Sequence, residues 1–388
     1  MQRQATDALI AARGLRELIL ANREDTESKR QVAEPIVEAL VASRLGRLSL
    51  PAEYGGLELP PADALAVFES LAEAEASVAW VVWNSSLPCW FARFLPKNVR
   101  DEVYGNPDDL YASSTRPTGR AKLNGDSYTI NGRWSLVSGC MHATWIPVMC
   151  MVEENGEVQM LAPNVPNLRM FFVPRETYEI LDTWHVGGLR GTGSHDAVLK
   201  DAVVPANRSF SVGDPSLLDS PLGRTPIMAT MSAGCASICL GITKSSLRAL
   251  LELATGKASI DGGPGLRDRG PAQSLVAKTQ TKLDALRREL TSGCERVWRK
   301  VEAGAAIEAA DIAAILSAAI VTAQECRAAL TEIYAAAGAS SLYTDSPIER
   351  GHRDIHAVTQ HIALQPFWLE QAGRVHVGLE PTHPLFWI

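Results

Sequence analysis

The stretch SYTINGRWSLVSG, residues 127–139, differs in pattern from the helix-like sequence on either side of it. It combines β-branched and aromatic residues with Asn131-Gly132, and an Asn-Gly pair is a strong signal for a tight hairpin turn. Two more such pairs occur at residues 124–125 and 155–156. The strand-like segments are residues 127–130, 145–152, 158–162, 168–173 and 197–199. They predict a small β-domain, a barrel or a sandwich, over residues 108–212.

Both sides of this β-domain carry apolar residues at helical spacing. The predicted helices are residues 7–22, 30–45, 63–76, a largely apolar segment at 77–90, and then 227–253, 272–303 and the alanine-rich 309–337. Alanine-rich faces let helices approach closely, as in bundles and subunit interfaces. We therefore expect a mainly α protein with a central β-domain: an N-terminal helical domain over residues 1–107, the β-domain over 108–212, and a C-terminal helical bundle over 213–388.

The composition is typical of a soluble globular enzyme, with 388 residues, 46% hydrophobic residues and a net charge of −7. A negative net charge argues against nucleic acid or an anionic membrane as the main partner, because both attract basic patches. The sequence has no run of 18 apolar residues, no signal-peptide pattern, and no CxxC pair among its seven cysteines. We expect a cytoplasmic protein without a transmembrane helix, whose thiols are free and buried.

Several motifs of nucleotide binding and hydrolysis are absent. No GxGxxG follows a strand and opens a helix, and no P-loop, HExxH or GxSxG occurs. His352 and His356 have the i,i+4 spacing that can chelate a metal on a helix, but no third ligand has suitable spacing. We therefore expect no metal site, and any electrons for redox chemistry should arrive on a diffusible carrier.

Six short blocks resemble the acyl-CoA dehydrogenase superfamily, and they occur in the matching order. They are LPAEYGGL at residues 50–57, ASSTRP at 112–117, NGRWSLVSG at 131–139, GGLRGTGS at 187–194, DAVVP at 201–205, and residues 338–354 with PIER and an Arg-Asp pair. The resemblance implies the acyl-CoA dehydrogenase fold, with an N-terminal helical domain, a middle β-barrel or sandwich and a C-terminal four-helix bundle. It also implies a homotetramer.

Within that superfamily the chain resembles the two-component flavin-dependent monooxygenases, known for 4-hydroxyphenylacetate, phenolic steroid, dibenzothiophene and indole substrates. The blocks typical of this branch lie at residues 134–139, 184–194 and 353–361. Many dehydrogenases place a catalytic glutamate nine residues after the arginine of the Arg-Asp pair. Counting from Arg353, that position is Ile362, directly after His361, and residues 228–242 contain no carboxylate either. Dehydrogenation of an acyl-CoA would therefore lack its general base.

The resemblance implies the oxygenase component of a two-component flavin-dependent monooxygenase. Such a component takes reduced FMN or FAD from a separate NAD(P)H-dependent flavin reductase and reacts with O2 through a C4a-hydroperoxyflavin. It would hydroxylate an aromatic or heteroaromatic small molecule that is phenol-like or indole-like. Three alternatives stay open: an N- or S-oxygenating enzyme of the same branch, an acyl-CoA dehydrogenase with an unusual base, and a non-catalytic relative.

The resemblance also assigns roles to residues. Ser138 would hydrogen-bond to the flavin N5, and His361 would be the acid–base residue, since the ordinary imidazole pKa near 6.5 suits proton transfer. Further flavin-binding candidates are Ser113, Ser114, Thr115, Trp134, Trp184, Arg267 and Arg269, and the candidate substrate-pocket residues are Trp83, Trp90, His142 and Trp145. Residues 266–273 lack the Phe-Gly of the dehydrogenase FAD segment, which favours FMN. A structural role in strand, core or loop is the alternative for each residue.

Overall fold

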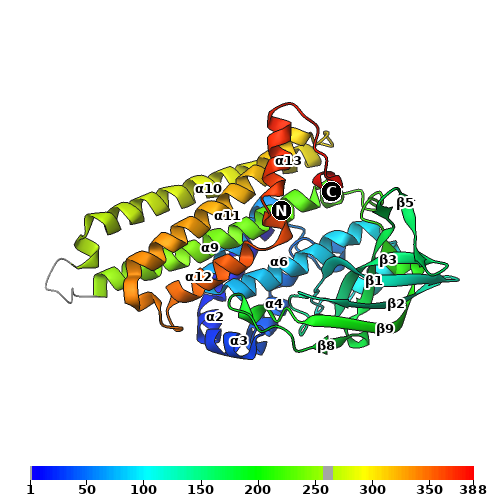
Figure 1. Ribbon diagram of the computed structural model, residues 1–388, viewed down its shortest axis with the longest axis horizontal. Helices are drawn as coiled ribbons and strands as arrows, with labels where there is room; N and C mark the ends of the chain where they lie inside the picture. The colour runs from blue at the N-terminus through cyan, green and yellow to red at the C-terminus, as the bar shows by residue number, and fades with distance from the viewer. Residues whose placement is uncertain (1, 257–264) are drawn as a thin grey trace.

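The chain folds into helices, then a sheet, then helices again, with the sheet at one end of an elongated molecule (Figure 1). The computed structural model describes residues 2–256 and 265–388. The helices before the sheet are α1 (Gln2–Gly14), α2 (Arg16–Ala21), α3 (Arg23–Lys29), α4 (Glu34–Ala42), α5 (Pro61–Ala74), α6 (Ala76–Trp90) and α7 (Lys97–Tyr104). The expected class, mainly α with a central β-domain, is confirmed.

Helix α6 runs through the middle of the protein because its sequence is apolar on every face. Every residue of the helix except Leu87 is buried. The Glu75 carboxylate accepts a hydrogen bond from the Ser77 N–H (3.3 Å) and caps the helix N-terminus. A helix that is hydrophobic all round needs partners on all sides. Helix α6 finds them in α5, in α9 (Ile227–Gly256) and in the turn η5 (Arg190–Thr192) of the β-domain.

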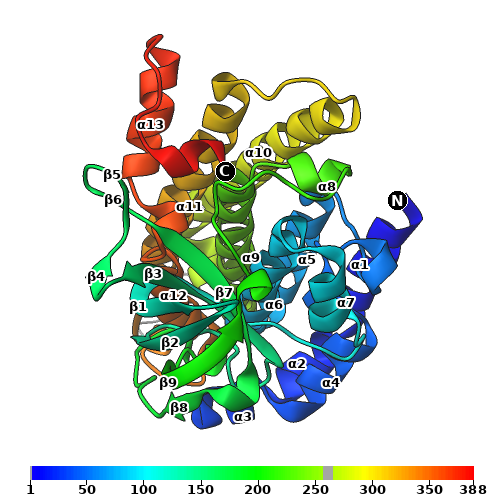
Figure 2. The same cartoon turned by 90° about the vertical axis from the view of Figure 1, so that its right-hand side faces the viewer.

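The main sheet has the strand order β10-β7-β3-β1-β2-β9-β8, and β4 pairs with β3. Its strands are β1 (Ser114–Asn124), β2 (Ser127–Trp134), β3 (Trp145–Glu154), β4 (Glu157–Val158), β7 (Leu168–Pro174), β8 (Glu179–Leu181), β9 (Asp196–Pro205) and β10 (Ser209–Phe210). A separate small hairpin joins β5 (Met160–Ala162) and β6 (Val165–Pro166). Figure 2 shows the main strands fanned out in front of α6 and α9.

Strand β1 is central in this sheet, although its sequence does not predict a strand. It pairs antiparallel with β2 and parallel with β3. Most of its residues are exposed, and Pro117 and Gly119 interrupt the alternation of apolar and polar residues. A Cβ at Gly119 would lie 2.1 Å from the Trp134 ring, so glycine lets this indole pack under the strand.

The helices after the sheet form a bundle around α9. They are α8 (Pro221–Arg224), α9, α10 (Gly270–Glu302), α11 (Ala309–Ala337), α12 (Pro347–Val358) and α13 (Phe367–His376). Close approach depends on glycine, because a Cβ at Gly234 would lie 2.5 Å from the Trp83 ring and one at Gly241 would lie 2.4 Å from the Glu69 carbonyl oxygen. The segments Ile227–Thr255 and Ala309–Ser341 are long and apolar enough to cross a membrane, but most of each segment's apolar window is buried in this fold, as in core helices of globular proteins.

A group of charged side chains connects α12 with α3 and with the residue before α6. We call it the Asp354 cluster: Glu27, Glu75, Arg350, Arg353 and Asp354. Arg350 lies 2.6 Å from a Glu27 oxygen and 3.2 Å from a Glu75 oxygen, and Arg353 lies 2.8 Å from Glu27. Asp354 Oδ1 accepts a hydrogen bond from the Leu189 N–H at 2.7 Å. The cluster therefore fixes the loop between β8 and β9 against the helices.

Candidate active site

Trp80 on α6 joins two residues that the sequence places far apart. Its Nε1–H donates a hydrogen bond to Ser138 Oγ at 3.0 Å. Its ring centroid lies 5.3 Å from that of His361, in an edge-to-face arrangement, and the Trp83 ring lies 5.0 Å from His361. Edge-to-face aromatic contacts at these distances are favourable. Ser138 of the β-domain and His361 of the C-terminal part thus contact the same indole.

His361 is half-buried between the end of α12 and the turn η9 (Ile362–Leu364). Its Nδ1 accepts a hydrogen bond from the Ala363 N–H at 3.2 Å, and the Cys235 thiol lies 4.0 Å from the same nitrogen. Because Nδ1 accepts, the proton of the neutral ring is on Nε2. Burial lowers the pKa of His361 to about 4, and no charged neighbour contributes to the shift. The resting imidazole is therefore neutral and donates from Nε2.

This low pKa predicts how stability depends on pH. The unfolded chain binds a proton at His361 below pH 6.5, whereas the folded chain binds it only near pH 4, so stability falls as pH drops from 6.5 to 4, by up to about 3 kcal/mol. We expect a His361→Gln variant to lose less in Tm over this range than the unmodified protein. Thermal unfolding at pH 6.5, 5 and 4 measures the difference, and parallel curves for the two proteins would contradict the assignment.

Ser138 is the end of a buried row of hydroxyls, which we call the hydroxyl row: Ser138, Ser194 and Thr192. Ser138 Oγ lies 2.7 Å from Ser194 Oγ, which lies 2.6 Å from Thr192 Oγ1. Thr192 Oγ1 then donates to the Leu189 carbonyl oxygen at 2.8 Å. Sequence reasoning singled out Ser138 alone, and the GTGS pattern of residues 191–194 was the available sign of the other two hydroxyls.

Asn84 is a second residue that the sequence analysis missed. Its Oδ1 is buried and has no hydrogen-bond partner among the described residues. At 100° per residue, Asn84 lies on the same face of α6 as Trp80, four residues earlier. The hydroxyl of its neighbour Ser85 accepts a hydrogen bond from the Tyr111 N–H at 3.3 Å. Val81, on the same side of the helix, packs against Gly139, where an added Cβ would lie 3.2 Å from the Val81 side chain. The unpaired Asn84 Oδ1 therefore belongs to the face of α6 that meets the β-domain.

A small cavity, with an accessible volume of about 10 Å³ and therefore room for about one water molecule, lies beside Trp83 among α5, α6 and the start of α9. The residues of its lining with large side chains or hydroxyls are Leu65, Phe68, Trp83, Trp90, Met231, Ser49, Ser86 and Thr230. Within residues 2–256 and 265–388, this lining contains no charged side chain. The surroundings of Trp83 on this side are therefore apolar or hydroxyl-bearing and uncharged, but they leave no room for an aromatic ligand as they stand.

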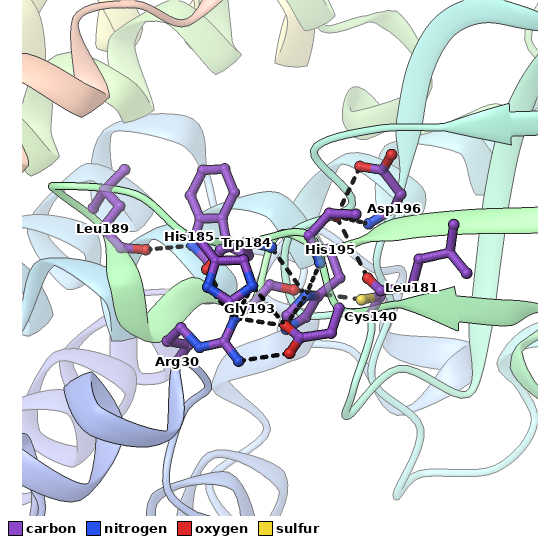
Figure 3. Close-up of polar contacts among 11 residues, drawn as sticks. Arg30, Cys140, Leu181, Trp184, His185, Leu189, Gly193, His195 and Asp196 are labelled. Carbon is purple, nitrogen blue, oxygen red and sulfur yellow. Dashed lines mark hydrogen bonds and ion pairs between the residues drawn. The ribbon is translucent and has the colours of Figure 1, made fainter.

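The predicted flavin-binding residues differ in burial and position. Ser113 and Ser114 are buried at the start of β1, whereas Thr115 is exposed. Trp184 is half-buried in the loop between β8 and β9, and its Nε1–H donates to the Leu189 carbonyl oxygen at 3.1 Å. Trp184 thus stabilises the carbonyl that ends the hydroxyl row (Figure 3).

Three predicted aromatic residues lie elsewhere. Trp134 is fully buried in the β-domain core, where its Nε1–H donates to the Met149 carbonyl oxygen at 2.8 Å, so its ring has no face for a ligand. Trp145 packs under the Arg208 guanidinium at 5.4 Å. The His142 side chain is buried 4.0 Å from Glu34, and burial lowers its pKa. Only Trp83 and Trp90 of the predicted pocket residues line the cavity.

Arg267 and Arg269 precede α10, at the end of the bundle that points away from the β-domain (Figure 1). Both are exposed, and Arg267 lies 4.0 Å from Asp268. Within one chain these arginines therefore lie far from the β-domain that carries Ser138. The resemblance in sequence did not show where these arginines lie relative to Ser138 and His361.

Comparison with known proteins agrees with this arrangement. The family model for the acyl-CoA dehydrogenase N-terminal domain matches residues 10–102, and that for the C-terminal domain matches residues 233–366. An indole-3-acetate monooxygenase from Pseudomonas putida is 32% identical over 361 residues, covering 92% of this chain and 90% of that protein. The flavin-dependent monooxygenase oxygenase subunit HsaA from Mycobacterium tuberculosis is 28% identical over 394 residues, 98% of each chain.

Among solved structures, XiaF from Streptomyces sp., in complex with FADH2 and glycerol, has a TM-score of 0.90 at 25% identity, covering 99% of this chain and 98% of that one. Similarity along the whole chain includes the segments that carry Trp80, Ser138 and His361. The chain therefore belongs to the acyl-CoA dehydrogenase superfamily, and within it to the flavin-dependent monooxygenases, as an oxygenase component that works with reduced flavin.

Proposed function

We propose that this oxygenase hydroxylates a small aromatic or heteroaromatic molecule, phenol-like or indole-like, in the cleft between α6, α9 and the β-domain. The observation that carries this proposal is that the Trp80 indole contacts both Ser138 and His361. In the proposal Ser138 binds the flavin and His361 moves the proton. The two groups would then act from opposite sides of one aromatic side chain.

Features of the described residues suit a flavin beside Ser138. Asn84 has a buried oxygen without a partner, and Leu136, two residues before Ser138, exposes half of its side chain. Ser113 and Ser114 offer hydroxyls from the neighbouring strand. When bound, reduced flavin supplies the electrons that activate O2. Ser138, Asn84 and these serines would hold its polar edge, and the surrounding apolar walls would keep water away.

The contacts of His361 favour proton donation over proton abstraction in the resting protein, because Nδ1 already accepts from Ala363. We propose that Nε2–H hydrogen-bonds to the oxygen to be transferred or to the substrate. The next residue, Ile362, is 49% exposed at the position where a dehydrogenase has its glutamate. Among the described residues, no carboxylate contributes to the shift in the pKa of His361. Both points speak against acyl-CoA dehydrogenation.

We propose that the substrate lies against Trp83, whose uncharged surroundings predict a preference among substrates. Two relatives are named for indole-3-acetate, whose carboxylate would need a charged or polar partner, and the residues around Trp83 in that cavity include no charged side chain. We expect indole and simple phenols to be hydroxylated with a lower KM than indole-3-acetate. The test supplies reduced flavin through a generic flavin reductase and follows the mass gain of one oxygen atom. A screen in which only anionic aromatics gain oxygen would reject the neutral-substrate proposal.

The relatives' names describe oxygenase subunits or components, which implies a separate flavin reductase as partner. We propose that this reductase is NAD(P)H-dependent, that the protein is cytoplasmic, and that it forms a homotetramer with domains over residues 1–107, 108–212 and 213–388. In such an assembly Arg267 or Arg269 would contact the phosphate of a flavin, FMN or FAD, bound to another copy. Light scattering measures the mass of the assembly in solution. A monomeric protein that binds FMN and FAD with equal affinity would exclude a phosphate contact from Arg267 or Arg269 of another copy.

A further inference from the structure

The hydroxyl row of Ser138, Ser194 and Thr192 is buried along its whole length, with exposed fractions of 5%, 3% and 1%. Its members are linked at 2.7 and 2.6 Å, and Thr192 lies 2.8 Å from the Leu189 carbonyl oxygen. Distances of this size are ordinary for O–H···O hydrogen bonds. Each hydroxyl has one proton to donate and two lone pairs that accept.

The direction of the row follows from its end. A carbonyl oxygen only accepts, so Thr192 gives its single proton to Leu189. The Thr192 oxygen can then take part in the 2.6 Å contact only as the acceptor of the Ser194 proton. Ser194 has no second proton, so it accepts the proton of Ser138 in the 2.7 Å contact. Every hydroxyl therefore donates away from the cleft.

Ser138 is left with one free hydrogen-bonding position. Its proton points to Ser194, and one of its lone pairs accepts from Trp80 Nε1–H at 3.0 Å. The remaining position is a lone pair, which accepts an N–H but repels another lone pair. Reduced isoalloxazine has a hydrogen on N5, whereas N5 of oxidised isoalloxazine is a bare acceptor. The two redox states thus differ in the atom that meets Ser138.

The geometry points to Thr192 and Ser194 as positioning residues that make Ser138 a hydrogen-bond acceptor, so that the site binds reduced flavin in preference to oxidised flavin. This inference rests on the proposed flavin site at Ser138. Neither residue touches the flavin in this account. They act by fixing the rotation of one hydroxyl, which an isolated serine would leave free to turn towards either redox state.

The loop that carries the row is held firmly enough for this role. Arg30 binds Asp182 through two hydrogen bonds, of 2.6 and 3.0 Å. His195 Nδ1 accepts from the N–H groups of Thr183 and Trp184, at 3.2 and 3.3 Å (Figure 3). Groups that direct a ligand need such support, because a loosely held side chain does not keep its orientation.

Thr192→Val tests the inference, since valine keeps the shape of threonine but removes the hydroxyl. Ser194 then has no acceptor in the row and can turn its proton towards Ser138, which in turn can donate to N5 of oxidised flavin. We expect the ratio of the Kd for oxidised flavin to the Kd for reduced flavin to fall by roughly 2- to 10-fold, the range expected for one hydrogen bond. The midpoint potential of the bound flavin should fall in step.

Thr192→Ser is the matched control, because it restores the hydroxyl and should restore the ratio. Ser194→Ala interrupts the row at a different point and should change the ratio in the same direction, which covers the case in which Thr192→Val does not fold. Anaerobic titrations of FMN and FAD in both redox states give the Kd values.

The possible outcomes distinguish an error in the proposed flavin site from an error in the role of Thr192 and Ser194. If the unmodified protein binds neither redox state, the proposed flavin site is wrong and the inference falls with it. If it binds flavin but neither Thr192→Val nor Ser194→Ala changes the ratio or the potential, only the inference is overturned. A ratio that rises would show that the hydroxyls donate towards the cleft, which also overturns it.

Discussion

Replacement of His361 by alanine is expected to lower product formation by ~10²- to 10⁴-fold, the usual contribution of a positioned acid–base group. The reason is that the imidazole is a titratable side chain whose ring contacts both Trp80 and Trp83. Flavin affinity should change little, because none of the flavin contacts proposed above involves His361. Consumption of O2 should continue, with the electrons released as hydrogen peroxide.

The measurement is a single turnover with chemically reduced flavin, O2 and an accepted substrate. It follows the oxygenated product by mass, the peroxide by a coupled assay, and flavin binding by fluorescence. His356→Ala is the matched control, since His356 is exposed on α12 and its ring packs at a tilt against that of His352, with the ring centroids 4.8 Å apart. An unchanged product yield in His361→Ala would remove His361 from the mechanism.

The order of helices and strands was predictable because local patterns carry it. The apolar run of α6 predicted a buried helix. Asn124-Gly125 and Asn155-Gly156 lie at the hairpin turns between β1 and β2 and between β3 and β4, as predicted. The hairpin predicted at Asn131-Gly132 is wrong, because this pair lies inside β2, where the pairing with β9 shifts register. Strand β1 was not predicted, because its exposed, polar residues and Pro117 are typical of a loop. Its stability in the sheet comes from pairing with β2 and β3 and not from its own side chains.

The site was predictable only in part, because it depends on contacts between residues far apart in sequence. Trp80 and His361 are separated by most of the chain, and no local pattern links them. Trp134 was a poor flavin candidate for a physical reason. Leu136 has a φ of +62°, so the regular alternation of the strand ends between Trp134 and Ser138. Trp134 therefore faces the core, and Ser138 faces the cleft.

Replacement of Asp354 by alanine is expected to lower the free energy of unfolding by about 1–3 kcal/mol, the range for leaving a buried hydrogen-bond donor without its partner. Asp354 is 4% exposed and accepts the Leu189 N–H at 2.7 Å. Alanine would leave that buried N–H without an acceptor. Chemical denaturation at pH 7 measures the loss.

Asp354→Asn is the informative control, because asparagine keeps an oxygen for the Leu189 N–H but has no charge. Burial, and then the nearby Glu75, raise the pKa of Asp354 to about 7. The folded chain thus holds a proton at Asp354 that the unfolded chain releases above its ordinary pKa of 3.8, so the carboxyl stabilises the fold less as pH rises from 4 to 7. Asp354→Asn should therefore gain stability relative to the unmodified protein over this range.

The same variants connect stability to the site. Leu189 contributes its N–H to Asp354 and its carbonyl oxygen to Thr192, so one residue joins the Asp354 cluster to the hydroxyl row. In Asp354→Ala the carbonyl loses its fixed position, and we expect the preference for reduced flavin to weaken together with stability. Asp354→Asn should keep both. Loss of stability in Asp354→Ala with an unchanged flavin preference would show that Leu189 is held by the rest of its loop.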